Sequence, residues 1–512
     1  MKRTFIYFPL FFGLLFLASF AAAQPDIQAL DQYIEQAQKD WNIPGMAVGI
    51  VKDGQVVLAK GYGVLEAGKY DPVNENSIFA IASNTKAFIA AAIGILVDEG
   101  KLNWDDPVQK HLPYFQLYDD YASQQATVRD LLCHRLGLGT FSGDVIWYKS
   151  QYSPEETVKR AAKVPQAYSF RAGYGYSNLM FIAAGEVIKA VSGKTWDAFI
   201  REHIFDPLEM NRTVTSVRSL PKMENVAQPH KPEGDKNEPI PYTNWDNMGA
   251  AGGILSSVSD LAKWMQLQID GGTHNGKQIF SEAAQSEFWK PHNNHKVTKF
   301  SKMLYPSRNF NGYGLGWGMS DYGGKMVAAH GGGYDGMYSR LTVVPEAKLG
   351  IVVLTNSMKG ISTYLTYRAL DHFLGLEEKD WSKIGLERQE ASVKAREKTL
   401  AERKEVRLEN TSPSLALENY SGQYSCEMYG NLAVELEDDK LHLLFKNAPN
   451  LNATLSHWHL NTFEINWNEV HAWFDYGTVQ FILDNNGKVQ ELQFDVPNGD
   501  IFFEEIQAKK VD

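Results

Sequence analysis

The order in which strand and helix patterns follow one another constrains the fold of this chain more than any other feature. Two strand patterns flank a turn signal at Asp53-Gly54, helical patterns dominate from about 128 to 204 and again after Ser259, and strand patterns return between 325 and 355. Strands at both ends of a helical middle predict a sheet whose two ends come from opposite ends of the domain. We therefore expect an α+β fold and not a series of βαβ units.

The N-terminus has the pattern of a secretory signal peptide, which we assign to residues 1–23. Two basic residues precede an apolar stretch that ends at Phe20, and three alanines then offer a cleavage site. The stretch is short and contains Pro9 and Gly13, so a cleaved signal is favoured over an uncleaved anchor. We expect a periplasmic or secreted protein, and no later segment has the pattern of a membrane span.

Composition and charge exclude several classes of protein. The chain has 512 residues, of which 44% are hydrophobic and 22% charged, and its net charge is −11. These values are ordinary for a soluble globular protein, and the acidic balance argues against a nucleic-acid partner. Only two cysteines occur, Cys133 and Cys426, far apart in the sequence. A disulfide framework is therefore not expected, and stability has to come from the hydrophobic core.

The rest of the chain divides into three parts. Residues 24–380 hold the strand–helix–strand pattern, and residues 381–413 are rich in Glu, Lys, Arg and Ala, which predicts an exposed helical linker. Residues 414–512 hold short alternating runs separated by polar turn signals such as Asp438-Asp439. Regular hairpins of this kind predict a small all-β barrel or sandwich.

A short polar motif opens an apolar helix pattern in the first part. Lys86 follows three residues after Ser83, and the apolar run 87–97 comes directly afterwards. Positions i and i+3 share one face of a helix, so the two side chains lie within reach of each other. A lysine with a pKa lowered by partial burial can take the serine proton, and a helix N-terminus suits a neighbouring oxyanion. The alternative is an ordinary capping serine with an exposed lysine.

Two later motifs offer partners for Ser83. Tyr176 and Asn178 precede a helix pattern, where a phenol can shuttle protons as phenolate or through Lys86, and a carboxamide can orient the lysine or hold a substrate carbonyl. A helix cap with a core aromatic ring is the structural alternative.

A glycine-rich motif, His330-Gly331-Gly332-Gly333, follows the strand pattern over 325–329. Clustered glycines at a strand edge indicate a bulge or the close approach of another backbone, and an oxyanion hole needs such an approach. A plain glycine-rich turn with a surface histidine is the alternative.

The order S-x-x-K, Y-x-N, H-G-G resembles the serine β-lactamase and penicillin-binding protein family. The closest resemblance is to the branch with class C β-lactamases, D-alanyl-D-alanine carboxypeptidases, D-aminopeptidases and esterases. Segments 131–138, with Leu136 where serine is usual, 252–261 and 313–317 also resemble family motifs, and the resemblance covers about residues 27 to 374. It implies a β-lactamase/transpeptidase-like fold, with an antiparallel sheet flanked by helices and an all-helical subdomain.

The end of the chain carries a second resemblance. Residues 420–424 are similar to the opening of lipocalin-like barrels that are appended to several of these exported hydrolases. In those proteins the barrel can shape the cleft or mediate assembly.

The family resemblance implies a role for each motif residue. These roles are Ser83 as the acylated nucleophile, Lys86 as its proton partner, Tyr176 as general base or acid, Asn178, His330, Gly331 and Gly332 as substrate-binding residues, and the backbone N–H groups of Ser83 and Gly333 as the oxyanion hole. Turnover would acylate Ser83 and then hydrolyse the acyl-enzyme with water. No cofactor and no metal are implied.

One departure from the family pattern bears on the substrate. Gly331 stands where many members have threonine, whose hydroxyl helps hold the carboxylate of β-lactams and of C-terminal D-alanine, and His330 is a weaker cation than lysine. Losing such a charge-assisted contact costs about 1.5–3 kcal/mol. We therefore expect a peptidase or esterase for short peptides, D-amino-acid-containing ones above all, or for small esters and amides. Efficient β-lactamase activity is the alternative.

Other classes fit less well. An α/β-hydrolase needs a G-x-S-x-G motif, which the sequence lacks, and His292 and His295 have no helix-spaced acid to complete a metal site. A cell-envelope protein that binds peptides without turnover remains the rival. The intact Ser83, Lys86 and Tyr176 argue against it, since a binder has no use for an activated serine. The sequence leaves the oligomeric state open.

Overall fold

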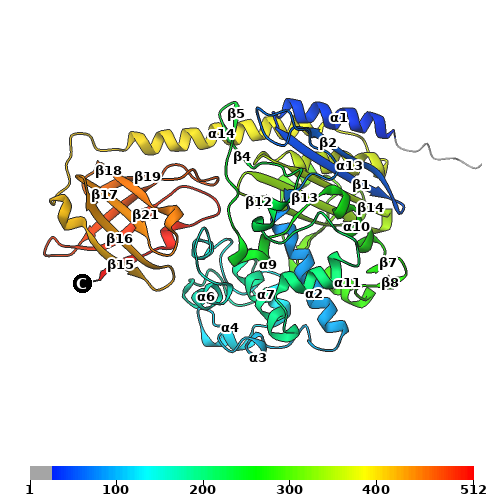
Figure 1. Ribbon diagram of the computed structural model, residues 1–512, viewed down its shortest axis with the longest axis horizontal. Coiled ribbons are helices and arrows are strands. Elements are labelled where there is room, and N and C mark those ends of the chain that lie inside the picture. The colour runs from blue at the N-terminus through cyan, green and yellow to red at the C-terminus, as the bar shows by residue number, and fades with distance from the viewer. Residues whose placement is uncertain (1–25, 512) are drawn as a thin grey trace, which may run out of the picture.

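The computed structural model describes residues 26–511, so the predicted signal peptide at 1–23 lies outside the described residues. The chain forms an N-terminal α+β domain and a C-terminal barrel (Figure 1). The long helix α14 (Trp381–Glu405) runs between them along one edge of the molecule.

The central sheet of the N-terminal domain joins the two ends of that domain, as the order of patterns predicted. All its neighbouring strands are antiparallel, in the order β2-β1-β14-β13-β12-β11-β10-β9. The first hairpin meets the last strand of the domain with Ile50 opposite Ile351. The strands are β1 (Gly45–Lys52), β2 (Gln55–Gly63), β9 (Asn293–Asn294), β10 (Asn311–Tyr313), β11 (Gly318–Tyr322), β12 (Lys325–Tyr334), β13 (Met337–Val344) and β14 (Leu349–Thr355).

Helices cover both faces of this sheet because side chains alternate along each strand. In β1, Met46, Val48 and Ile50 belong to the core under α1 (Ile27–Asp40) and α13 (Ile361–Leu374). On the opposite face α10 (Val258–Ile269) packs closely, since a Cβ on Gly49 would lie 3.1 Å from Val258 Cβ.

A helical region packs against the α10 side of the sheet (Figure 1). At its centre lies α2 (Thr85–Asp98), whose residues 85–96 are all buried, beside α7 (Asn178–Ser192). The expected helical stretch 128–204 is broken by turns into several short helices and the longer helix α7. The remaining α-helices are α3 (Val108–His111), α4 (Asp120–Gln125), α5 (Val128–Leu131), α6 (Pro154–Arg160), α8 (Trp196–Ile200), α9 (Gly249–Gly252), α11 (Glu282–Phe288) and α12 (Lys299–Leu304).

The C-terminal domain is a closed antiparallel barrel, β15 to β22 in sequence order. Asp438 and Asp439 both have positive φ in the turn between β16 and β17, a conformation typical of tight hairpins. The barrel strands are β15 (Gly422–Cys426), β16 (Gly430–Glu437), β17 (Lys440–Phe445), β18 (Ala453–His459), β19 (Thr462–Trp467), β20 (Thr478–Leu483), β21 (Val489–Asp495) and β22 (Ala508–Val511). Short two-stranded sheets pair β3 (Phe79–Ala80) with β6 (Leu255–Ser256), β4 (His230–Glu233) with β5 (Lys236–Pro239), and β7 (Thr273–His274) with β8 (Lys277–Gln278).

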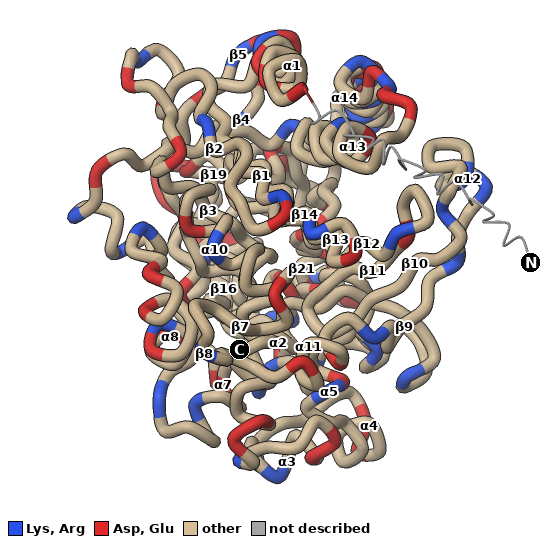
Figure 2. Tube along the Cα trace, turned by 90° about the vertical axis from the view of Figure 1, so that its right-hand side faces the viewer, with Lys and Arg blue, Asp and Glu red and all other residues tan. Residues whose placement is uncertain are grey.

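Polar contacts attach the barrel to the N-terminal domain. The Tyr152 hydroxyl donates to Tyr429 O at 2.8 Å, and Lys231 Nζ donates to His471 O at 2.7 Å. Buried residues of both domains form one contiguous core cluster. Acidic and basic residues are interspersed along the trace in the view of Figure 2. Within residues 26–511, no helix combines the length and apolar character needed to cross a membrane.

Candidate active site

Ser83 lies on a one-turn 3₁₀ helix, Ala82–Asn84, that leads directly into α2. Ala82 has φ of +47°, a conformation that is strained for a residue with a side chain and that occurs at functional sites. The neighbouring strand β13 holds this turn in place, since Ser339 Oγ donates to Ile81 O and accepts from Asn84 Nδ2, each at 2.8 Å. The turn before α2 is therefore fixed by the central sheet.

Lys86 points back from the first turn of α2 to Ser83. Its buried Nζ donates to Ser83 Oγ at 3.0 Å, to Asn178 Oδ1 at 2.7 Å and to Ala251 O at 2.8 Å. Burial lowers the Lys86 pKa from 10.5 to about 7, although the nearby Asp144 opposes this shift. Near neutral pH, a substantial fraction of this amine is therefore unprotonated and able to accept a proton.

Asn178, the first residue of α7, has a partner at each end of its carboxamide. Its Oδ1 accepts from Lys86, and its Nδ2 donates to Asp144 Oδ2 at 2.6 Å. Asp144 is buried, and burial raises its pKa to about 8. The motif residue Asn178 thus connects the lysine to a carboxyl group that the sequence analysis did not identify.

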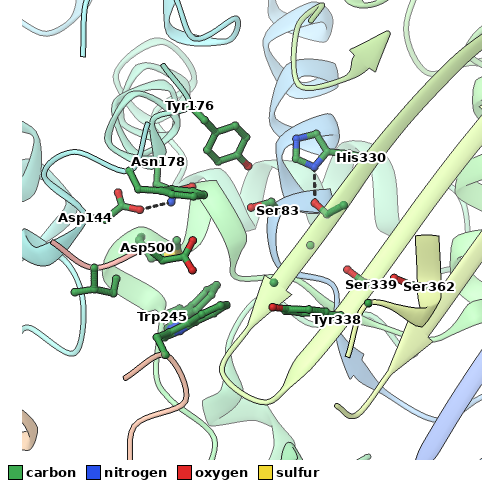
Figure 3. Close-up of a pocket in the computed structure, with 18 of the residues that line it drawn as sticks. Ser83, Asp144, Tyr176, Asn178, Trp245, His330, Tyr338, Ser339, Ser362 and Asp500 are labelled. Atoms are coloured by element: carbon green, nitrogen blue, oxygen red, sulfur yellow. Dashed lines mark hydrogen bonds between the residues drawn. The ribbon is translucent and has the colours of Figure 1, made fainter. Parts of the chain in front are cut away.

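Tyr176 lies beside the serine, and Figure 3 shows its hydroxyl directed towards Ser83. The Lys86 amine lies 4.8 Å from the centre of its ring. Burial raises the Tyr176 pKa well above 10, while the contact with Ser83 lowers it in part. Such a pKa favours the neutral phenol at physiological pH.

His330 and the three glycines lie within β12, which continues to Tyr334, whereas the sequence placed them where the strand ends. A Cβ on Gly332 would lie 2.2 Å from Ile81 O, so β12 approaches the serine turn as closely as the glycine cluster predicted. His330 Nε2 pairs with the Tyr313 hydroxyl at 2.8 Å, and burial lowers its pKa to about 3. A neutral imidazole therefore stands where the resemblance implied lysine or histidine.

These residues surround one pocket of about 400 Å³. Ser83, Tyr176, Asn178, His330 and the three glycines line it, so the structure brings all the predicted motifs together, with Lys86 in contact with Ser83 beneath the surface. Figure 3 shows Tyr338 and Trp245 on the side of the pocket away from Tyr176.

The barrel also lines this pocket. Trp473 lies in the loop between β19 and β20, and Asp500 and Ile501 lie in the loop between β21 and β22. Asn498 braces the second loop, because its Oδ1 accepts from the backbone N–H of Asp500 at 3.0 Å and of Ile501 at 2.6 Å. Burial raises the Asp500 pKa to about 6. The sequence contained no signal for these residues, since they are more than 280 positions away from Tyr176 in the chain.

The His134 ring packs against the ring of Tyr176. Its ring centre lies 4.2 Å from that of Tyr176, and its Nδ1 accepts from the backbone N–H of Ser177 at 3.0 Å. This histidine belongs to segment 131–138, which resembles a family motif, but the sequence alone assigned it no role. His292 and His295 lie outside the pocket, and within residues 26–511 no cluster of three His, Cys, Asp or Glu side chains is arranged to hold a metal.

A serine on a strained turn, with a buried lysine against its hydroxyl, defines this site as that of a serine hydrolase. Residues 30–373 match the family model described as Beta-lactamase, and the chain belongs to that family. Residues 406–510, which include the barrel, match a domain of unknown function, DUF3471.

Similar proteins include a fungal hydrolase, a penicillin-binding protein homologue and a D-amino acid amidase. Unguisins hydrolase ungD' of Aspergillus campestris is 28% identical over 445 residues, which cover 83% of this chain and 80% of that protein. The penicillin-binding protein homologue of Pyrococcus abyssi, described as octameric, superposes with a TM-score of 0.62 at 24% identity, over 95% of this chain and 100% of that one. The D-amino acid amidase of Ochrobactrum anthropi SV3 gives a TM-score of 0.56 at 23% identity, over 68% and 98%. The two structures share the fold of this chain.

Proposed function

We propose that this chain is an exported serine hydrolase that forms an acyl-enzyme at Ser83 with short peptides, above all those that contain D-amino acids, or with small esters and amides. The observation that carries this proposal is the contact of 3.0 Å between the buried Lys86 amine and the Ser83 hydroxyl. The names of the relatives point the same way, since one is an unguisins hydrolase and another a D-amino acid amidase.

The reaction begins when Ser83 Oγ attacks the substrate carbonyl and its proton passes to neutral Lys86. The backbone N–H groups of Ser83 and Gly333 stabilise the oxyanion of the tetrahedral intermediate. Neutral Tyr176, beside both Ser83 and Lys86, donates a proton to the leaving group and is reprotonated from the lysine. Water then attacks the acyl-enzyme by the same route in reverse and releases the acid.

The charges around the pocket favour substrates without a carboxylate. Among the described residues that line it there is no Lys or Arg, His330 is neutral, and Asp500 is ionised above a pH of about 6. A carboxylate in this pocket would meet a like charge and no permanent cation on the described lining, whereas an amine would meet Asp500. Amides and esters with a free amino group therefore suit the site better than β-lactams or peptides with a C-terminal carboxylate.

Mass spectrometry of the intact protein after treatment with a fluorophosphonate tests the nucleophile. We expect one adduct, located at Ser83 and absent from Ser83→Ala. Ser362→Ala is the matched control, because Ser362 lines the same pocket away from Lys86 and its loss should leave labelling unchanged. A folded protein without an adduct would favour the non-catalytic binding protein, and an adduct elsewhere would identify a different nucleophile.

A substrate comparison tests the charge argument. Hydrolysis of an alanine ester with a free amine should exceed that of its N-succinyl counterpart, and Asp500→Asn should reduce this preference. Nitrocefin turnover at the rates of resistance enzymes would contradict the proposal and favour the β-lactamase alternative.

A further inference from the structure

We propose that Asp144 is a positioning residue that fixes the orientation of the Asn178 carboxamide and thereby directs the lone pair of neutral Lys86 at Ser83. The inference rests on the proposed function and concerns how the base is aligned. Asp144 lies at the start of a short 3₁₀ helix, Asp144–Ile146, on the far side of Asn178 from the lysine.

The first step is the orientation of Asn178. A carboxamide has an accepting oxygen and a donating nitrogen of similar shape, so its environment decides which end points where. The oxygen Oδ2 of Asp144 lies 2.6 Å from Nδ2 and accepts from it. With the nitrogen held by Asp144, the oxygen of Asn178 has to face Lys86, as the 2.7 Å contact shows.

The second step is the direction of the lysine lone pair. Neutral lysine has two N–H bonds and one lone pair, and Nζ has three polar neighbours. Asn178 Oδ1 and Ala251 O can only accept, so each takes one N–H. The third position, through which the protonated amine donates to Ser83 Oγ, then holds the lone pair, and the Ser83 hydroxyl is the only one of the three neighbours with a proton to give.

The reversed carboxamide shows why this matters. If Asn178 turned over, its Nδ2 would donate to Nζ and compete with Ser83 for the lone pair. In its ionised form Asp144 excludes that state, because the carboxylate has no proton to donate to the Asn178 oxygen that would then face it. Asp144 is only 2% exposed and follows Gly143, whose positive φ of 80° allows the turn that brings the carboxyl inward.

The same contacts assign one of two predicted roles to Asn178. The sequence left open whether this residue orients the lysine or holds a substrate carbonyl. With Lys86 at its oxygen and Asp144 at its nitrogen, the carboxamide orients the lysine.

The rate of fluorophosphonate labelling tests this chain of contacts in the full-length protein. Asp144→Ala frees Asn178 to turn over, and we expect labelling about 100-fold slower, the contribution of a positioned base. Asp144→Asn can present either its oxygen or its NH2 group to Asn178, so it retains the hydrogen bond without excluding the reversed carboxamide, and we expect a rate between those of Asp144→Ala and wild type. Partial rescue by asparagine separates positioning from a merely structural role. Circular dichroism and the melting temperature verify that both variants are folded.

Asp260→Ala is the matched control for the loss of a buried carboxyl group. Asp260 is 3% exposed and accepts from the backbone N–H of Arg212 and the Thr213 hydroxyl, away from Lys86. This variant should label at the wild-type rate. A wild-type rate in folded Asp144→Ala, or an Asp144→Asn rate as low as that of Asp144→Ala, would overturn the proposal. A wild-type protein that does not label at all would instead overturn the proposed function.

Discussion

At the scale of single residues, burial decides which groups of the site carry charge. It lowers the pKa of Lys86 to about 7 and that of His330 to about 3, and it raises that of Tyr176 well above 10. All three shifts favour neutral forms, because a charged group loses hydration when it is buried. The site thus holds a basic amine, a neutral imidazole and a neutral phenol around one hydroxyl.

The pKa of Lys86 predicts the pH dependence of acylation. Below pH 7 the amine is protonated and has no lone pair, so kcat/KM should fall by about tenfold per pH unit. Above pH 7 the amine is free and the rate should level off. A neutral ester without an amino group is the substrate to use, because Asp500 then does not affect binding. A profile that is flat between pH 5 and 9 would contradict this role, and Lys86→Met should remove the activity at every pH.

The sequence revealed those residues of the site that belong to a short recognisable motif. Ser83 and Lys86 lie one helical turn apart, so spacing alone placed them together. Asp144 is 34 residues from Asn178, and Asp500 comes from another domain. A single aspartate in a loop has no spacing that marks it, and these two residues become visible only when the fold brings them to the pocket.

At the scale of elements, the barrel supports the segment that carries Asp144. Glu505, on a 3₁₀ helix (Phe503–Glu505) between β21 and β22, accepts from the Gly143 N–H at 2.7 Å and from the Ser142 hydroxyl. Burial raises the pKa of this carboxyl. The barrel therefore contacts the loop directly before Asp144 as well as lining the pocket.

This contact predicts that a substitution in the barrel lowers activity. Glu505→Ala should lower kcat/KM and reduce the free energy of unfolding by about 1.5–3 kcal/mol, the contribution of hydrogen bonds to a charged group. Glu504→Gln is the control, since Glu504 accepts from Val496 within the barrel. Steady-state kinetics and urea unfolding measure both effects. Unchanged kinetics in Glu505→Ala would mean that the loop keeps its position without the barrel.

Element boundaries show where sequence patterns stop being informative. The hairpin at Asp53-Gly54 and the helix start at Pro154 follow from local turn and cap chemistry, and both occur in the structure. The strand β12 extends through the glycines because pairing with β13 continues to Tyr334 opposite Met337. A glycine run predicts an interruption locally, whereas the neighbouring strand and the adjacent serine turn require it to remain extended.

At the scale of the whole molecule, the two domains share a continuous core without disulfide support. Cys133 in the N-terminal domain and Cys426 in β15 are both free and buried. Burial raises the pKa of Cys133 to about 12, so its thiol is unreactive in the folded protein. The core cluster includes both cysteines and extends across the domain boundary. Loss of packing in one domain should therefore destabilise the other.

The two cysteines provide one reporter for each domain, which allows this coupling to be measured. Pulse labelling with a maleimide along a urea series, read out by peptide mass spectrometry, should show both thiols protected in buffer and exposed over the same range of urea. Coincident exposure follows because the buried cluster spans both domains, so that unfolding the barrel would expose apolar surface of the N-terminal domain. Exposure of Cys426 at clearly lower urea than Cys133 would show that the barrel unfolds independently.

In that case, activity should be lost together with Cys426 protection, because Trp473, Asp500 and the Glu505 contact would leave the pocket with the barrel.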